Sequence, residues 1–270
     1  MQGNASGGKA ANPFKTHWYH RKLPYLFRKD RDRPLGTRDA PEVVRFDVEE
    51  GVKASSMPPV RIYLGTEPAQ HRAERVFIWS VKQVRDPSRV YEIYLMSDLA
   101  GINREGWKTG FSHYRYAIPT LAGKKGRAIY NDVDQIYLAD PAELFDFEFG
   151  DAGVAAIDEN ENSVMLIDCE KMAPYWNRDA VNEGHKHPFF KEKVIANGLF
   201  SACDGRWNSR DGEFPVEETK CLHYTTLHTQ PWQPFPDQLR YGRSPVAHVW
   251  EDLEKQADAA GFPTRDSEPS

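Results

Sequence analysis

The segment VRIYLGTEPAQHRAERVFIWSVKQVRDPSRVYEIYLMSD, residues 60–98, carries the pattern that decides the fold. Its first part, residues 60–66, is rich in β-branched and aromatic side chains, as a short buried strand is. Apolar side chains then recur at helical spacing through 68–84, and a second strand follows at 89–98. A strand, a helix and a strand in this order predict a parallel α/β sheet. Ligands of such sheets bind at the carboxyl ends of the strands, so Thr66 and Glu67 are expected binding residues.

The rest of the chain continues the alternation of strands and helices. We expect a helix at 111–123, a strand, an acidic turn, a second strand and the start of a helix within 126–145, strands at 151–159 and 163–169, and a helix at 187–200. Beyond residue 200, prolines and weak periodicity predict irregular structure that wraps the sheet. The chain therefore divides into an N-terminal arm at 1–58, one α/β domain at 59–250 and an acidic, flexible tail at 251–270.

The composition argues against several classes of protein. The 270 residues hold 35 Lys and Arg against 40 Asp and Glu, and this net charge of −5 does not suit a broad nucleic-acid surface. The three cysteines, Cys169, Cys203 and Cys221, lack the spacing of a disulfide framework or a thiolate zinc site. No apolar run approaches the ~18 residues of a spanning helix, and the N-terminus does not resemble a signal peptide. We expect a cytoplasmic protein.

The N-terminal arm interleaves aromatic and basic side chains in HWYHRKLPYLFRKDRDRP, residues 17–34. One interpretation is that the aromatic rings dock onto the domain and leave the bases in water. The other is that the arm contacts an anionic membrane surface or a polyanionic acceptor, which would make the protein membrane-peripheral. The sequence leaves both open.

An acidic turn, Asp132-Val133-Asp134, follows directly on the apolar residues of a predicted strand. Residues i and i+2 of an extended segment point the same way, so the two carboxylates share one side of the chain. They repel each other unless a cation lies between them, and such hard oxygen ligands suit Mg²⁺ or Mn²⁺ bound to phosphate oxygens. A solvated acidic turn without a ligand is the alternative interpretation of so short a motif.

Three further segments make the acidic turn more specific. The stretch FSHYRYAIPTLAGKKGRAIYNDVDQIYLADPAELF, residues 111–145, resembles the segment of the family 8 glycosyltransferases in which an arginine-bearing helix precedes a D-x-D metal motif. SVMLIDC at 163–169 is similar to the next strand of that family, and LHYTTLHTQPW at 222–232 is similar to its closing signature. Family 8 is the glycogenin and lipopolysaccharide galactosyltransferase group. The resemblance covers about residues 60–235 and implies a GT-A fold, with a mixed, mainly parallel sheet flanked by helices.

The resemblance also implies a function. It predicts a metal-dependent hexosyltransferase of class EC 2.4 that moves a hexose from a nucleotide-sugar, UDP-linked in this group, with retention of configuration. The acceptor is an unidentified saccharide, glycolipid or protein. Asp132, Asp134 and His223 match the ligands of the family's Mn²⁺, for which Mg²⁺ is the substitute, and Arg115 matches the arginine before the metal loop. The expected nucleotide-sugar-binding residues are Thr66, Glu67, Arg115, Asp132, Val133, Asp134, Asn162 and Gln230.

The chain departs from the family pattern at several positions. The lysine of the closing signature is Gln230 here and its glycine is Thr226, so one phosphate-binding charge is missing. The tyrosine that stacks on uracil has no clear counterpart at 67–71. The family's Asp-Gln pair beside the donor sugar is also not found, and Asn208 and Asp211 are the nearest candidates for this catalytic role.

Two other functions remain open. The first is a haloacid dehalogenase-type phosphohydrolase, which also places two aspartates after a strand, although Gln135-Ile136 fits its motif poorly. The second is a non-catalytic descendant that keeps the GT-A fold for binding, which the change to Gln230 favours.

Overall fold

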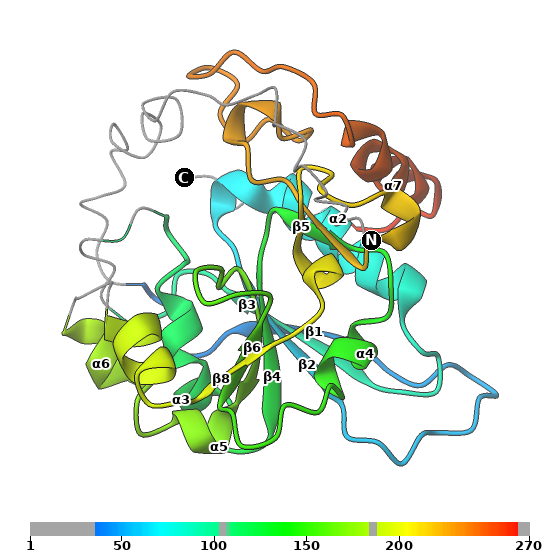
Figure 1. Cartoon of the computed structure of the whole chain (residues 1–270). Helices are drawn as coiled ribbons and strands as arrows, with labels where there is room; N and C mark the ends of the chain where they lie inside the picture. The colour runs from blue at the N-terminus through cyan, green and yellow to red at the C-terminus, as the bar shows by residue number, and fades with distance from the viewer. Residues whose placement is uncertain (1–35, 103–106, 108, 184–187, 264–270) are drawn as a thin grey trace, which may run out of the picture.

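The structure is a computed structural model that describes residues 36–102, 107, 109–183 and 188–263 (Figure 1). The aromatic and basic segment predicted to form an arm, at 17–34, lies outside the described residues. The described part of the arm contains strand β1, Glu42–Phe46, which pairs antiparallel with β3. The predicted domain boundary at residue 59 is therefore corrected, because the main sheet already includes residues 42–46.

The predicted α/β fold with a mixed sheet is confirmed. The strands of the main sheet lie in the order β1-β3-β2-β4-β7-β6-β8, and their bounds are β2 Val60–Gly65, β3 Tyr91–Met96, β4 Arg127–Asp132, β6 Val154–Ala156, β7 Val164–Asp168 and β8 Phe200–Ala202. Strand β2 runs parallel to both β3 and β4, and β8 runs parallel to β6. Strand β7 pairs antiparallel with β4 and with β6. The carboxyl ends of β2 and β4 therefore meet at one edge of the sheet.

A second, small sheet stands beside this edge. It has the order β5-β10-β9, with β5 at Gln135–Tyr137, β9 at Ser209–Arg210 and β10 at Cys221–His223. The acidic turn carries the chain from β4 of the main sheet directly into β5 of the small one. Strand β10 pairs antiparallel with β5, which places His223 opposite Gln135. The small sheet thus brings the end of β10 to the end of β4.

Helices cover both sheets and supply the rest of the core. The described α-helices are α2 His71–Val84, α3 Ile118–Leu121, α4 Pro141–Phe145, α5 Cys169–Met172, α6 Arg178–Asn182 and α7 Ala247–Ala259. The described short 3₁₀ turns are Pro68–Gln70, Tyr114–Ala117, Gly205–Asn208, Val216–Glu218 and Leu227–Thr229. Helix α2 contacts β5 and α7, and Figure 1 shows α2 and α7 side by side on one flank of the molecule. The strands β2, β4 and β7 are buried almost throughout, so the core lies around the centre of the main sheet.

Two predictions about the second half of the chain need correction. The expected helix at 187–200 is a π-helix at Pro188–Ile195 that ends before β8. The predicted flexible tail is wrong for residues 251–259, which belong to α7. Trp250, Leu253 and Ala257 recur at helical spacing and are buried, and this apolar stripe is what packs the helix against the domain.

In the described part of the chain, no helix combines the length and the hydrophobicity that crossing a lipid bilayer requires.

Candidate metal centre

The two aspartates of the acidic turn lie where β4 leaves the main sheet. The backbone N–H of Asp132 donates to the carbonyl of Ser163 at 3.1 Å, and that of Val133 donates to the carbonyl of Gly65 at 3.1 Å. Val133 is 1% exposed, so its side chain belongs to the core and only its backbone can meet a ligand. The alternation of side chains then leaves Asp132 and Asp134 together on the other side of the turn.

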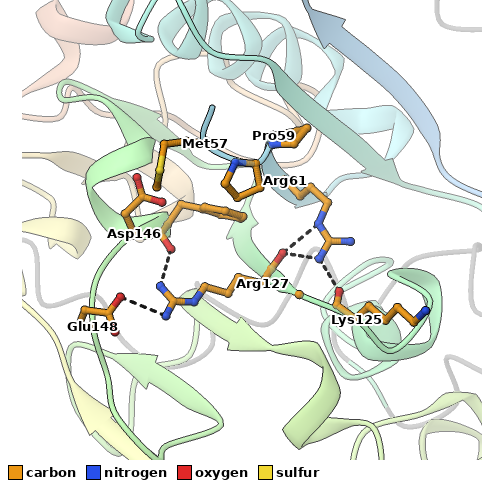
Figure 2. Close-up of a pocket in the computed structure, with 10 residues that line it drawn as sticks. Met57, Pro59, Arg61, Lys125, Arg127, Asp146 and Glu148 are labelled. Atoms are coloured by element: carbon orange, nitrogen blue, oxygen red, sulfur yellow. Dashed lines mark hydrogen bonds and ion pairs between the residues drawn. The ribbon is translucent and has the colours of Figure 1, made fainter. Parts of the chain in front are cut away.

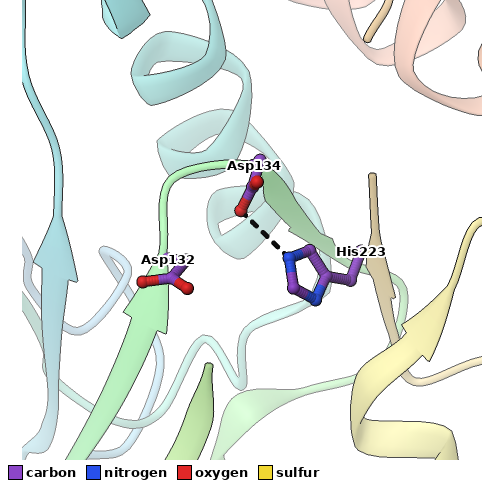
Figure 3. A group of neighbouring side chains, drawn as sticks. All are labelled: Asp132, Asp134 and His223. Atoms are coloured by element: carbon purple, nitrogen blue, oxygen red, sulfur yellow. Dashed lines mark ion pairs between the residues drawn. The ribbon is translucent and has the colours of Figure 1, made fainter. Parts of the chain in front are cut away.

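His223 reaches these carboxylates from a distant part of the sequence. It ends β10, and the next residue fastens the turn, because the N–H of Tyr224 donates to the carbonyl of Asp134 at 2.9 Å. One potential ligand atom from each of Asp132, Asp134 and His223 lies within 4.8 Å of the other two (Figure 3). The Nε2 atom of His223 lies 3.1 Å from Oδ1 of Asp134. Two carboxylates and one imidazole at such spacing can hold one divalent cation. We call Asp132, Asp134 and His223 the metal group.

Asn208 fixes the orientation of the His223 ring. The Nδ1 atom of His223 lies 2.8 Å from Oδ1 of Asn208, and the Nδ2 atom of Asn208 donates to Oγ of Ser163 at 3.1 Å. Because the amide oxygen can only accept, Nδ1 carries the proton and Nε2 faces the carboxylates. The structure therefore places Asn208, predicted to be catalytic, behind the histidine as a positioning residue.

The charges of the group favour a cation at its centre. Burial lowers the pKa of His223, but the neighbouring Asp134 carboxylate, with smaller contributions from Glu161 and Asp132, more than offsets this and raises it to about 9. Burial also raises the pKa of Asp132, against the opposing effect of Arg115. Without a metal ion, the imidazolium of His223 is thus the cation that balances Asp134.

Arg115 binds the other side of Asp132. Its Nη2 donates to Oδ1 of Asp132 at 2.8 Å, and its guanidinium lies over the ring of Tyr130 with 4.4 Å to the centroid. Burial lowers the pKa of Arg115, but the Asp132 carboxylate, together with Tyr130 and Tyr116, more than offsets this and holds it above its usual value. Because the hydroxyl of Tyr130 donates to the same Oδ1, both donors act on one oxygen and leave Oδ2 for a metal ion.

Asn162 and Gln230, predicted to contact the nucleotide-sugar, form hydrogen bonds with Arg115 and Asp134 of the candidate site. Asn162 accepts from Nη1 of Arg115 through its side-chain oxygen and its carbonyl, both at 2.6 Å, and its Nδ2 donates to the hydroxyl of Tyr116 at 3.0 Å. Gln230 donates through Nε2 to Oδ2 of Asp134 at 3.2 Å and to the carbonyl of Tyr224 at 2.9 Å. The neutral amide at this position therefore touches a predicted metal ligand directly.

Thr66 and Glu67 lie at the carboxyl end of β2, as the strand pattern predicts. Their side chains are buried and already bonded, since the hydroxyl of Thr66 donates to Glu74 at 2.8 Å and Oε2 of Glu67 accepts from the N–H of Gly110 at 3.2 Å. These bonds tie the strand end to helix α2 and to the loop before residue 111. The structure thus gives both side chains contacts within the fold.

Asp211 forms hydrogen bonds with His223 and with the two threonines that follow Tyr224. Its N–H donates to the carbonyl of His223 at 2.8 Å, and its Oδ2 accepts the hydroxyls of Thr225 and Thr226 at 2.6 and 2.8 Å. Its φ of 50° is unusual for a residue other than glycine and persists only where the surroundings hold it. Asp211, predicted to be catalytic, is placed where it orders the segment after the histidine.

Tyr130 and Gly65 are residues of the site that the sequence motifs did not indicate. A Cβ atom at Gly65 would lie 2.6 Å from the hydroxyl of Tyr130 and 2.7 Å from the ring of Phe111, so only glycine leaves room for that hydroxyl to reach Asp132. The alternation of the strand RAIYND was the available signal, because it puts Tyr130 and Asp132 on one face.

The comparisons with known proteins place this geometry in a known fold. No protein-family model matches the chain, and a search of curated proteins gives no match. Among solved structures, the glycosyltransferase GlyE of Streptococcus pneumoniae TIGR4 superposes with a TM-score of 0.55 at 16% identity, over 78% of this chain and 66% of GlyE. The bifunctional glycosyltransferase WbbM gives 0.54 at 12% identity, over 75% of this chain and 53% of WbbM.

The galactosyltransferase LgtC, solved in complex with donor and acceptor sugar analogs, gives a TM-score of 0.50 at 12% identity, over 73% of this chain and 96% of LgtC. This chain therefore spans most of LgtC but less than two thirds of GlyE and WbbM. The matches confirm the predicted GT-A fold, which these glycosyltransferases share.

Proposed function

We propose that this chain, which has the GT-A fold, is a metal-dependent glycosyltransferase that takes a hexose from a nucleotide-sugar. The observation that carries the proposal is the convergence of Asp132, Asp134 and His223 at the carboxyl edge of the main sheet. The 3₁₀ turn that bears Arg115 adds a buried guanidinium beside the same carboxylate. In open α/β sheets this edge is the usual place for a ligand.

The donor set fits a divalent ion bound to a diphosphate. When bound by Asp132, Asp134 and His223, the ion supplies positive charge to the diphosphate leaving group. The imidazole nitrogen makes Mn²⁺ a better fit than Mg²⁺, which prefers oxygen ligands. Arg115 and Tyr130 hold the Asp132 carboxylate in place before the donor arrives, so that little reorganisation is needed during the reaction.

The proposed donor is a UDP-hexose, and the proposed outcome is transfer with retention to a saccharide, glycolipid or protein acceptor. Both rest on the resemblance of 111–145 and 222–232 to the family 8 enzymes and on the likeness of the fold to LgtC. The haloacid dehalogenase alternative gains no support from the fold, since GlyE, WbbM and LgtC are all glycosyltransferases.

The test is metal-dependent binding and slow hydrolysis of the donor. Asp132→Asn keeps an oxygen for Arg115 and Tyr130 but removes the charge that holds the ion. We expect it to lower the affinity for Mn²⁺ and for UDP at least about tenfold in titration calorimetry. Release of UDP from UDP-glucose or UDP-galactose, with water in place of the acceptor, should fall in parallel. Asp237→Asn, on an exposed residue outside the group, is the matched control and should change neither.

A second candidate function is a binding protein that keeps the GT-A fold without catalysis. The neutral side chain of Gln230, bonded to Asp134 where the family has a lysine, favours this candidate. Such a protein would bind UDP or a UDP-sugar with Mn²⁺ and release no UDP over hours. Folded wild-type protein that neither binds nor cleaves any nucleotide-sugar with Mn²⁺ or Mg²⁺ would contradict both candidates.

A further inference from the structure

A pocket lies at the amino ends of β2 and β4, at the opposite end of these strands from the metal group. It encloses about 650 Å³ between the chain before β2, the turn that leads into β4 and the segment after α4 (Figure 2). Arg61 and Arg127 lie at the amino ends of the parallel strands β2 and β4, whereas Asp132 ends β4. Arg127 and Asp132 are five residue steps apart along the strand, a distance of roughly 17 Å. The pocket is therefore separate from the proposed donor site.

Two guanidinium groups at this pocket are bonded mainly to backbone carbonyls. The Nη2 atom of Arg61 donates to the carbonyls of Lys125 and Arg127, both at 2.6 Å, and its Nε donates to the latter at 3.0 Å. Gly126, with a φ of +65°, shapes this turn, and a Cβ atom there would lie 3.0 Å from Nη2 of Arg61. Within the described ranges Arg61 has no carboxylate partner. Carbonyl dipoles satisfy its N–H groups but leave its charge uncompensated.

Arg127 is held by long hydrogen bonds and by a cation–π contact with Phe149, 5.2 Å from the ring centroid. Its Nη1 donates to the carbonyls of Phe145 and Phe147 at 3.3 and 3.2 Å, and its Nη2 lies 3.4 Å from Oε1 of Glu148. Charge-assisted hydrogen bonds are usually about 2.7–2.9 Å long, so none of these is strong. The side chain of Glu148 is 85% exposed, and such a surface pair contributes little. Arg127 can therefore turn to a better anionic partner.

The other acid of the pocket is already neutralised. Asp146 accepts from Nη1 and Nη2 of the buried Arg89 at 2.5 and 3.0 Å. The bidentate geometry fixes this pair and removes the Asp146 charge from the balance. Arg61 and Arg127 then face Glu148 alone, and the pocket keeps net positive charge.

Part of the pocket lining is apolar. Figure 2 shows Met57 and Pro59 in the upper part of the pocket, with Arg61 beside Pro59 and Arg127 below, and Phe145 also lines the pocket. Met57 is 49% exposed, and among the described residues it is one of only three large hydrophobic side chains left so open. An exposed apolar wall beside uncompensated arginines suits a ligand that has both an apolar body and an anionic group.

We infer that this pocket binds an organic phosphate, with the phosphoryl group at Arg127 and Arg61 and the apolar part against Met57 and Pro59. Arginine presents planar, paired donors that match phosphate oxygens, and the Arg127 donors are the weakly engaged ones. The ligand is either a free organic phosphate or the phosphate headgroup of a lipid. The inference goes beyond the proposed transferase activity and does not depend on it.

The test measures phosphate binding in EDTA, so that the metal group does not contribute. Phenyl phosphate supplies both a ring and a phosphoryl group, and inorganic phosphate supplies only the latter. We expect the full chain to bind phenyl phosphate below about 1 mM and inorganic phosphate at least fivefold more weakly. Vesicles with phosphatidic acid, compared with phosphatidylcholine alone, identify a lipid source, whereas binding of phenyl phosphate without vesicle binding identifies a free one.

The variants separate charge from the apolar wall. Glu148→Gln removes the competing acid and should tighten both phosphates at least threefold, while Glu170→Gln, on an exposed residue that does not line the pocket, is the matched control and should change neither. Met57→Ser should weaken phenyl phosphate only. Arg127→Gln should abolish binding and Arg127→Lys should restore part of it.

Three results would overturn the inference. They are binding of neither phosphate nor vesicles by folded protein, equal effects of Glu148→Gln and Glu170→Gln, and loss of phosphate binding in Asp132→Asn. The last variant is the test of the proposed function, so it distinguishes failure of one proposal from failure of the other.

Discussion

At the scale of single residues, the orientation of His223 depends on one buried amide. Asn208 is fully buried and accepts from Nδ1, which leaves Nε2 to face the two aspartates. Partners of this kind on a metal-binding histidine typically contribute 10–100-fold in metal affinity. The sequence pointed to Asn208 as a catalytic candidate, and its contacts in the structure are those of a positioning residue.

We predict that Asn208→Ala lowers the affinity for Mn²⁺ about 10–100-fold, because the ring loses the acceptor that fixes its tautomer. Titration calorimetry on the folded variant measures this change. Asn208→Asp keeps an acceptor at the same place and should retain most of the affinity. If the alanine and aspartate variants lose affinity equally, while both keep the thermal stability of the wild type, the positioning role of Asn208 is wrong.

At the scale of secondary-structure elements, helix α7 closes one flank of the domain. The ring of Trp250 packs on that of Trp232 with 5.5 Å between centroids, and Trp232 in turn donates through Nε1 to Gln70 at 2.6 Å. Arg75 of α2 reaches Asp258 at 2.6 Å. Gln70 directly precedes α2. The segment that contains Trp232 and helix α7 therefore both pack against α2.

We predict that Trp250→Ala lowers the free energy of unfolding by about 3–5 kcal/mol, because it removes a buried ring and leaves a cavity. Urea denaturation followed by circular dichroism measures the change. Glu251→Ala is the control on the same helix. Glu251 pairs with the largely exposed Arg243, so its loss should cost under about 1 kcal/mol. Equal stability of the two variants would show that α7 contributes little to the domain.

At the scale of the whole molecule, the metal group joins the two sheets. Asp132 ends a strand of the main sheet, His223 ends a strand of the small sheet, and Asp134 lies in the turn that connects them. A cation bound to all three links both sheets in the folded chain, and the unfolded chain has no such preformed site. Binding therefore stabilises the folded state by mass action.

We predict that Mn²⁺ at 100 times its dissociation constant stabilises the fold by about 2.7 kcal/mol and raises the melting temperature by roughly 5–10 °C. Excess EDTA should reverse the shift. In Asp134→Asn the shift should disappear, whatever the melting temperature of the variant without metal. A wild-type shift that persists in this variant would place the ion elsewhere.

The sequence by itself determined the core of the fold and the three potential metal ligands. A run of β-branched and aromatic residues and the helical spacing that follows it in 60–98 predicted β2, α2 and β3, because buried strands favour such side chains and an amphipathic helix needs apolar residues on one face. The resemblance of 111–145 and 222–232 to a known family predicted Asp132, Asp134 and His223 as ligands, and the structure brings these three residues together.

Only the tertiary structure decided which neighbours the polar side chains around the site bond to. Asn162 accepts a hydrogen bond from Arg115, Asn208 accepts one from His223, and Gln230 donates one to Asp134. Each of these three residues was predicted to contact the donor or take part in catalysis. The pairing of β10 with β5 creates these contacts between residues far apart in the chain. Hydrogen bonds depend on distances of about 3 Å and on direction, and one-dimensional spacing fixes neither across so long a separation.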